Sequence, residues 1–191
     1  MLDRKTYFIK ERVKFLRMSD TYDILDPVTQ ETIGIAIENP GNLIRVLRFL
    51  VNKRILPTRV DIYENQDHPP VLSIKRGVTF FRAKVDILNA NGDSIGYFKS
   101  KVFTLGGGFH VYDLNDNKVA EVKGDWKGWN FKLLNANGSE VGTVTKTWAG
   151  IGQELFTSAD NYVIDLKDPA EGSGGLLLAA GLAIDTVFNE N

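Results

Sequence analysis

The segment that decides the fold is the last one, GGLLLAAGLAIDTVFNEN, at residues 174–191. From Leu176 to Ile184 it contains no charged or strongly polar side chain. At about 100° per residue, these positions point in every direction around a helix, so the helix has no polar face to leave in water. Such a helix must be enclosed, and the rest of the chain has to supply the enclosure.

The expected central helix, residues 175–188, is too short to cross a bilayer. At about 1.5 Å per residue it reaches roughly 21 Å, whereas a span needs about 20 consecutive apolar residues. The small residues Ala179, Ala180, Gly181 and Ala183 allow a neighbouring element to approach closely. We therefore expect protein rather than lipid around this helix, and no transmembrane span.

The body of the chain has the pattern of short β-strands separated by turns. About twelve such runs are expected, near residues 7–13, 22–25, 32–37, 58–63, 71–76, 80–88, 94–100, 109–113, 118–123, 129–134, 140–145 and 161–165. No linker or change in composition divides the chain, so we expect a single domain over residues 1–191.

A weak internal repeat joins several of these strands. LNANGDSIGYF (88–98), DLNDNKVAEV (113–122) and LLNANGSEVGTV (133–144) each pass from an apolar run through an Asp/Asn turn to a second run with a small residue. LDPVTQETIGIAI (25–37) is a looser version. Such turns favour antiparallel hairpins. A calcium loop is the alternative, but none of the segments continues to a glutamate at EF-hand spacing.

One other segment has helical periodicity, residues 42–53 (NLIRVLRFLVNK), which follow Pro40 and Gly41. Its polar side holds Arg45, Arg48 and Asn52, and its apolar side holds Leu43, Leu47, Leu50 and Val51. The segment is either an outer helix packed on a barrel or an interfacial helix whose basic face touches anionic lipid. We favour the packed outer helix, because strands precede and follow it directly.

Composition excludes several classes of function. The formal net charge is −1 and the pI about 6.1, so no global field attracts nucleic acid. Residues 1–60 nevertheless carry 11 Lys/Arg against 7 Asp/Glu, so the basic excess is local. There is no cysteine, hence no disulfide and no thiolate metal site. The opening MLDRKTYFIKERVKF has no apolar run of signal-peptide length, which predicts a cytoplasmic protein.

The inventory for catalysis is thin. His68 and His110 are far apart in the sequence, and neither lies in a metal-ligand spacing. No zinc-protease, nucleophile-elbow or phosphate-loop motif occurs. The glycines at 106–108 precede a strand rather than a helix, which favours a hairpin turn over a phosphate cradle. We expect a protein that is not an enzyme and requires no cofactor.

Four segments in this order resemble the phospholipid scramblase and LURP-one-related families of the tubby C-terminal-like superfamily: KGDWKGWNF (123–131), TKTWAG (145–150), ELFTSADNYVIDL (154–166) and LLLAAGLAIDTVF (176–188). ILPTRVDIYENQ (55–66), VLSIKRG (71–77) and GGGFHVYD (106–113) extend the resemblance over the chain. It implies a mainly β fold, a closed antiparallel barrel of about twelve strands around a central hydrophobic C-terminal helix. The independent strand count and the enclosed helix agree with this. Unlike animal scramblases, the chain has no cysteine cluster.

The same resemblance suggests an anion site. Tubby proteins bind phosphoinositide headgroups through Lys and Arg on the barrel exterior, as point charges and forks that contact phosphate. The candidates here are Lys10, Arg12, Lys14, Arg45, Arg48, Lys75, Arg76, Lys99 and Lys101. The alternative is that these are ordinary solubilising residues of outward strand positions.

Scramblases also have an acidic segment that is proposed to bind Ca²⁺, and Asp160, Asp165 and Asp168 occupy its approximate place, with Asn161. Within one strand Asp160 and Asp165 point to opposite faces, so an acidic turn without metal is the favoured interpretation.

Other residues are expected to be structural. They are the helix residues Leu176, Leu177, Leu178, Gly181, Leu182 and Ile184, and the tryptophans Trp126, Trp129 and Trp148 as core or rim packing. Asp185 is disfavoured by the dipole near a helix C-terminus, so it should meet a cation or several donors, or lie at the barrel mouth.

Together these observations predict a scramblase-related binding protein that acts near membranes through anionic phospholipid or phosphoinositide headgroups. Two alternatives remain: a soluble regulatory or protein-interaction module, and a small-molecule carrier. A helix inside the barrel leaves little volume for a carried ligand. Transbilayer scrambling by one copy is not expected, because no segment reaches spanning length.

Overall fold

The computed structural model describes residues 1–12, 20–47, 49–51, 55–78, 84–100, 108–125, 128–146, 161–167 and 174–185. These residues form twelve strands and two helices, in close agreement with the expected runs. The strands are β1 (Thr6–Glu11), β2 (Thr21–Leu25), β3 (Thr32–Glu38), β4 (Thr58–Tyr63), β5 (Leu72–Arg76), β6 (Lys84–Asn89), β7 (Ser94–Ser100), β8 (Gly108–Tyr112), β9 (Lys118–Asp125), β10 (Asn130–Asn135), β11 (Glu140–Thr145) and β12 (Tyr162–Leu166).

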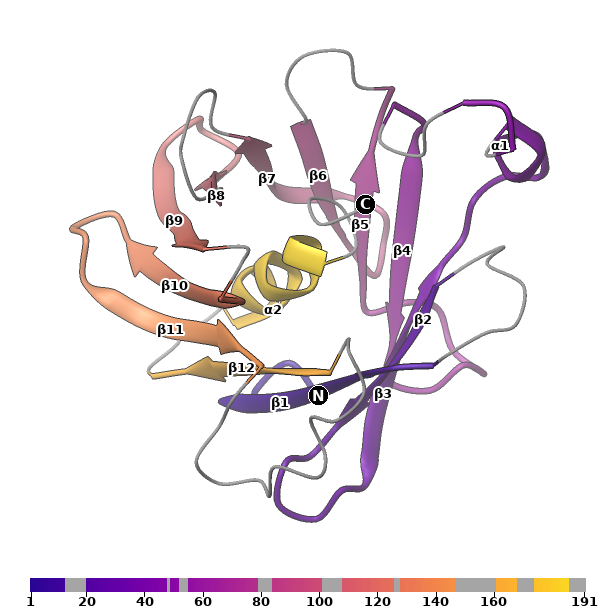
Figure 1. The fold of residues 1–191 in the computed structure, drawn as a ribbon. Helices are drawn as coiled ribbons and strands as arrows, with labels where there is room; N and C mark the ends of the chain where they lie inside the picture. Colours follow the sequence, from indigo (N-terminus) through magenta and orange to yellow (C-terminus); the bar gives the residue numbers. More distant parts are fainter. Residues whose placement is uncertain are drawn as a thin grey trace.

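The strands close into a barrel in which every neighbouring pair is antiparallel. Each strand from β2 to β11 pairs with the strands before and after it in the chain, and β1 closes the ring between β2 and β12. Figure 1 shows the strands arranged around the second helix, α2 (Gly174–Ala183), which lies in the middle of the ring. The predicted closed twelve-strand barrel with a C-terminal helix is confirmed.

The core forms between α2 and the inward side chains of the strands. Alternate residues of each strand point inward, as Val60 and Ile62 of β4 and Leu72 and Ile74 of β5 do, and these are fully buried. From Leu177 to Ile184 every residue of α2 and its last turn is also buried. The helix packs against β5, β7 and β12.

Gly181 sets how closely α2 approaches the barrel wall. A Cβ atom at this position would lie 2.6 Å from Cδ1 of Ile164 in β12, closer than real Cβ atoms come. The small residues of the helix therefore have the role expected from the sequence. They let the wall and the helix meet without a void.

The repeated Asp/Asn segments are hairpins, as predicted. In the β6–β7, β8–β9 and β10–β11 turns, Oδ1 of the first residue accepts backbone N–H bonds from the residues two and four positions later, at 2.8–3.0 Å. Those first residues are Asn89, Asp113 and Asn135. The fourth residue of each turn has a positive φ, 84° at Gly92, 61° at Asp116 and 82° at Gly138. The side chain thus satisfies the turn's own backbone and leaves no ligand loop.

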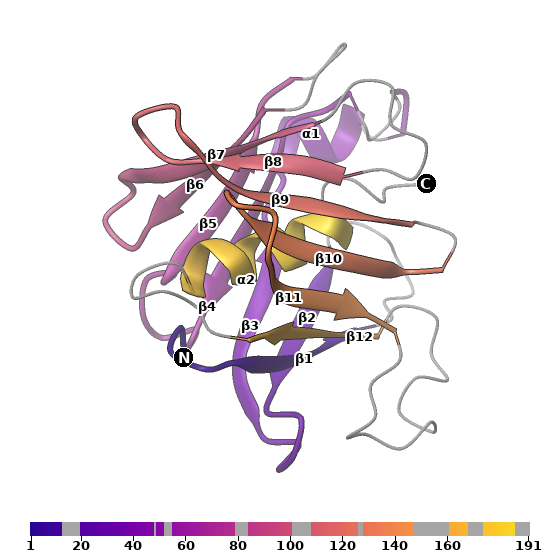
Figure 2. The same cartoon turned by 90° about the vertical axis from the view of Figure 1, so that its left-hand side faces the viewer.

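The up-and-down strand order gives the barrel two distinct ends. Connections that follow odd-numbered strands lie at one end, and those that follow even-numbered strands lie at the other. The Asp/Asn turns all belong to the second set, and we call this the turn end. The β3–β4 connection, which contains α1 (Asn42–Leu47), belongs to the first, the α1 end. In Figure 2 the turn after β8 lies at the left, whereas β9 and β11 finish at the right.

The helix expected at 42–53 lies outside the barrel wall, but it differs from the expected packed helix in two respects. The helix α1 ends at Leu47, and no residue of it is buried. On the predicted contact side, Leu43 and Leu50 are 71% and 80% exposed and Val51 is 37% exposed, whereas Leu47 is half-buried. The physical reason lies in the outer surface of β4 and β5, where Arg59, Asp61, Ser73 and Lys75 offer no apolar surface to cover.

Truncation of the central helix should destabilise the barrel far more than truncation of α1. Leu178 is fully buried, so Leu178→Ala should lower the free energy of unfolding by about 2–5 kcal/mol. Leu43→Ala removes the same atoms from an exposed position and should change it by less than about 0.5 kcal/mol. Urea unfolding followed by circular dichroism measures both. Equal effects would contradict a helix enclosed by the barrel.

Glu140 should link β10 to the segment after β12 through two ion pairs that acid breaks, and we call these two ion pairs the clamp. It accepts bonds from Lys132 of β10 at 2.8 Å and from Lys167, after β12, at 2.7 Å, which lowers its pKa to about 2 from 4.5. A lowered pKa means that the contribution is present above the unfolded pKa and disappears as pH falls toward 2. The stability difference between the wild type and Glu140→Gln should therefore be constant near neutral pH and vanish in acid. A difference that persists at pH 2 would contradict the clamp.

Candidate functional site

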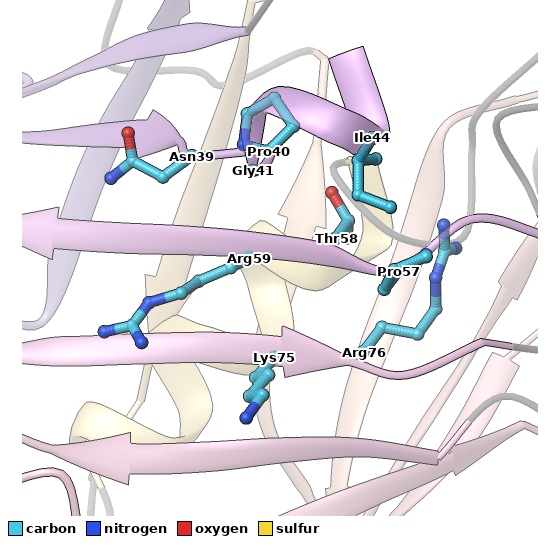
Figure 3. Close-up of a pocket in the computed structure, with 9 residues that line it drawn as sticks. All are labelled: Asn39, Pro40, Gly41, Ile44, Pro57, Thr58, Arg59, Lys75 and Arg76. Carbon is cyan, nitrogen blue, oxygen red and sulfur yellow. The ribbon is translucent and has the colours of Figure 1, made fainter. Parts of the chain in front are cut away.

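A pocket of about 120 Å³ lies at the α1 end, between the β3–α1 connection and the adjoining ends of β4 and β5 (Figure 3). Its lining contains three cationic side chains, Arg59, Lys75 and Arg76, and no carboxylate. The remaining lining residues are Asn39, Pro40, Gly41, Ile44, Pro57 and Thr58. Ile44 belongs to α1, so this helix forms part of the rim. The composition is that of an anion site.

Arg59 is held on the outer face of β4 by a polar network. Its Nε donates to Oδ1 of Asp61 at 2.8 Å, and its Nη2 donates to Oγ of Ser73 at 3.2 Å. Asp61, which is buried, also accepts bonds from Asn39 Nδ2 at 2.7 Å and from Ser73 Oγ at 2.6 Å. The network fixes Asn39, at the entrance to α1, against β4. It therefore positions the guanidinium and the pocket rim together.

Arg76 is the buried cation of the pocket. It points inward from the end of β5, is 3% exposed, and donates from Nη2 to the carbonyl of Leu56 at 3.1 Å. In Figure 3 its side chain extends toward Ile44 and Pro57, whereas Arg59 lies along the strands. Thr58 sits directly across the ladder from Arg76 and donates its hydroxyl to Glu38, which is also buried. The inner part of the pocket is thus a fixed polar framework.

Lys75 is the cation most available to a ligand. It is exposed, and it has no carboxylate partner anywhere in the described part of the chain. The β4–β5 register places Lys75 directly opposite Arg59, which is paired with Asp61, and the β5–β6 register places it opposite Asp86 on its other side. Like charges directly opposite each other in a sheet repel and destabilise it. Asp61 and Asp86 offset part of this repulsion, and an anion bound between the two cations would reduce it further.

The other predicted basic residues divide into three groups. Lys10, Arg45 and Lys99 are exposed and lie toward the α1 end. Arg12 instead makes a two-pronged ion pair with Asp23, whose hydrogen bond raises the pKa of Arg12. Lys14, Arg48 and Lys101 lie outside the described residues. The structure therefore brings Lys75 and Arg76 into one pocket, places Arg45 in the helix that forms part of its rim, and leaves Lys10 and Lys99 on other strands.

The two ends of the barrel differ in charge. The five hairpin connections at the turn end, residues 26–31, 64–71, 90–93, 113–117 and 136–139, contain no Lys or Arg, and all but the last contain Asp or Glu. Lys118 and Lys167 lie at the same end and are paired with Glu121 and Glu140. Two of the hairpin carboxylates are held ionised. Bonds from Asn117 lower the pKa of Asp113, and backbone N–H bonds from Thr29 and Val28 lower that of Asp26. The hairpins at the turn end are thus acidic, whereas the pocket at the α1 end is cationic.

The calcium hypothesis stays a prediction. Asp160 and Asp168 lie outside the described residues. Asp165 is half-buried and accepts a bond from Thr6 Oγ1 at 2.8 Å. Within the described ranges, no three His or acidic side chains come together as metal ligands would.

Asp185 lies half-buried in the π-helical turn that ends α2. Burial is the main cause that raises the pKa of Tyr22 and Tyr162, and the charge of Asp185 is the second cause for both. The carboxylate therefore lies near two core tyrosines.

Trp129 belongs to the core, as expected. Its ring packs against Tyr162 and Phe131, with centroids 5.3 and 5.9 Å apart, and Lys146 Nζ lies 4.5 Å from it. Trp126 and Trp148 lie outside the described residues.

The two histidines do not form a common site. His68 is exposed in the β4–β5 connection, and His110 is half-buried on β8 with its Nε2 3.6 Å from Glu121. The strands β5, β6 and β7 lie between them in the wall.

Comparison with known proteins shows the family of this chain. The family model described as Scramblase matches residues 15–191, which is nearly the whole chain. The chain belongs to the scramblase family. This scramblase-family barrel is 20% identical over 194 residues to "Altered inheritance rate of mitochondria protein 25" of Saccharomyces cerevisiae. The match covers 86% of the present chain but only 59% of the yeast protein. No solved structure gives a significant match.

No helix in the described ranges combines the length and the apolar character needed to cross a bilayer.

Sequence reasoning missed Arg59, Asn39 and the connection around Pro57 as parts of the site. A signal was present, because Arg59 alternates with Thr58 and Val60 and so must face outward. The position opposite it is Lys75, but this follows only from the β4–β5 register. That register is set across a connection of eight residues, 64–71, whose length and composition do not specify it.

Asp61 should be the residue that holds the outer part of this site. Asp61→Ala leaves Asn39, Ser73 and Arg59 without their shared acceptor, and should lower the free energy of unfolding by about 1–3 kcal/mol. Asp67→Ala, in the exposed β4–β5 connection, is the matched control and should change it by less than about 0.5 kcal/mol. Urea denaturation measures both variants, and equal losses would contradict the network.

Proposed function

We propose that this scramblase-family barrel is a non-enzymatic binding protein that recognises anionic phospholipid or phosphoinositide headgroups at a membrane surface. The site is the pocket at the α1 end. The observation that carries the proposal is the like-charged pair Arg59 and Lys75, opposed across the ladder beside a pocket whose lining has no carboxylate. A phosphate group supplies the charge and the acceptor oxygens that such a pair needs.

Family membership supports a role connected with phospholipids. It does not identify the lipid, because one fold serves many functions. The volume of the pocket limits which part of a lipid could bind there. A volume of about 120 Å³ suits a phosphate group and part of its headgroup rather than a whole lipid. The acyl chains of the ligand would therefore remain outside the pocket.

The competing small-molecule carrier is less well supported. A carrier barrel needs an internal cavity, and α2 with its buried Leu178, Ala179 and Leu182 occupies the centre of this one. Catalysis is not part of the proposal, because His68 and His110 are separated and no acid–base pair lines the pocket. The protein-interaction module remains the alternative that the binding experiment must separate.

Neutralisation of the pocket should weaken binding to anionic vesicles selectively. Each Lys or Arg near an anionic surface contributes about 1 kcal/mol, so Arg59→Gln with Lys75→Gln should lower affinity by about 2 kcal/mol, roughly thirtyfold. Co-sedimentation with phosphatidylcholine vesicles containing phosphatidylserine or a phosphoinositide measures this. Wild-type binding should decrease as salt concentration rises.

The matched control removes the same charge from other parts of the barrel. Lys118→Gln with Lys167→Gln should leave binding within about twofold of wild type, because these residues lie toward the turn end and are paired with Glu121 and Glu140. Absence of salt-sensitive binding to every anionic vesicle would overturn the proposed function and favour a protein-interaction module. Equal losses in the two double variants would show that binding depends on net charge rather than on the pocket.

A further inference from the structure

Large apolar side chains protrude from the molecule beside the pocket. Leu43 and Val46 of α1 and Phe49 and Leu50 of the following turn are 71%, 61%, 81% and 80% exposed. We call these four residues the apolar tip. They lie within eight positions of one connection, and α1 buries none of its own residues. The segment therefore contributes little to the core.

The apolar tip is part of an uneven distribution over the barrel. Nine large apolar side chains are exposed in the described ranges, and seven of them belong to residues 43–78, in the β3–β4 connection and just after β5. The other two, Val28 and Leu114, stand singly in separate hairpins at the turn end. Isolated exposed apolar residues are ordinary, whereas a contiguous group marks an interaction surface.

Charges around the apolar tip indicate what it contacts. Arg45 lies within the same helix and is exposed, with no carboxylate partner among the residues that the structure describes. Lys75 and Arg59 lie in the neighbouring pocket, whose rim includes Ile44 of α1. Apolar side chains with adjacent cations match the boundary of an anionic bilayer, where acyl chains lie beneath a layer of phosphates. A protein partner would need an apolar patch ringed by acidic groups to match the same surface.

We infer that the apolar tip inserts into the headgroup–acyl boundary of an anionic bilayer and so orients the barrel. The α1 end faces the membrane, the pocket meets the phosphate layer, and the acidic turn end points into water. This inference rests on the proposed headgroup recognition and adds to it the inserted residues and the orientation. Insertion of apolar side chains also gives the binding a component that salt does not screen.

The absence of cysteine makes the depth of the apolar tip directly measurable. Leu50→Cys, labelled with an environment-sensitive NBD fluorophore, is mixed with phosphatidylcholine vesicles with and without phosphatidylserine. The emission should shift to the blue and be quenched by nitroxide lipids only with the anionic vesicles. Val28→Cys and Leu114→Cys carry the same probe at the turn end and should keep the emission of water-exposed dye.

Co-sedimentation of the same samples separates failure of the inference from failure of the proposed function. Binding without a blue shift at Leu50 means that the pocket recognises headgroups while the apolar tip stays in water, which overturns only the insertion. No binding to anionic vesicles overturns both. A blue shift at Leu50 without vesicles that grows with protein concentration means that a second copy covers the apolar tip, and this too overturns insertion.

A pair of polar substitutions tests the energetic contribution of the apolar tip. Phe49→Ser with Leu50→Ser should weaken binding to phosphatidylserine vesicles at least tenfold while the remaining binding becomes more sensitive to salt. Val28→Ser with Leu114→Ser removes comparable exposed apolar surface and should leave affinity within about twofold. Circular dichroism checks that both variants fold, as expected for exposed positions. Unchanged affinity in the first pair would overturn the inference.

Discussion

The enclosure of α2 is the constraint on which the rest of this barrel depends, and it acts in both directions. In a small barrel, the side chains of the wall fill the interior by themselves. A ring of twelve strands is wider than this, so another element has to occupy its centre. A helix without a polar face cannot remain in water. The helix therefore fills the interior of the ring, and the ring shields the helix from water. The absence of a side chain at Gly181 lets Ile164 of the wall reach the helix surface. The stability of the folded protein and the closure of the sheet therefore depend on the same contacts between α2 and the strands.

Because the interior is used for packing, function has to reside on the exterior and at the ends. The up-and-down strand order places the connections at two ends of the barrel, and the connections at the two ends also differ in residue composition. At the turn end, Asp and Asn side chains satisfy the turn backbones and fix the hairpins. At the α1 end, the β3–β4 connection brings exposed apolar residues next to a cationic pocket. The cationic pocket and the exposed apolar surface of the β3–β4 connection are therefore adjacent.

The local features of this fold were predictable because they depend on neighbours in sequence. The Asn89, Asp113 and Asn135 turns bond to residues at most four positions away, and the strands alternate at a period that local sequence displays. The α1 segment shows what local sequence cannot predict, namely whether an apolar side is covered by another element. Its periodicity in leucine is real, but packing requires a partner surface, and the strands beneath present Arg59 and Asp61 instead. Leu43 and Leu50 of the apolar side therefore face solvent.

Hydrophobic periodicity and turn chemistry are local properties of the chain, so they were enough to predict about twelve short strands and a C-terminal helix that must be enclosed. The closed barrel was an expectation from the resemblance to the scramblase family, and the strand pairing confirms it. The sequence also determined which basic residues were available. Which of them lie side by side depends on the fold. Arg59 and Lys75 are 16 positions apart and become neighbours through the β4–β5 register, and Asn39 joins them through Asp61. Register and pairing across long connections are set by the closure of the whole sheet, and for that reason the site could not be read from the sequence.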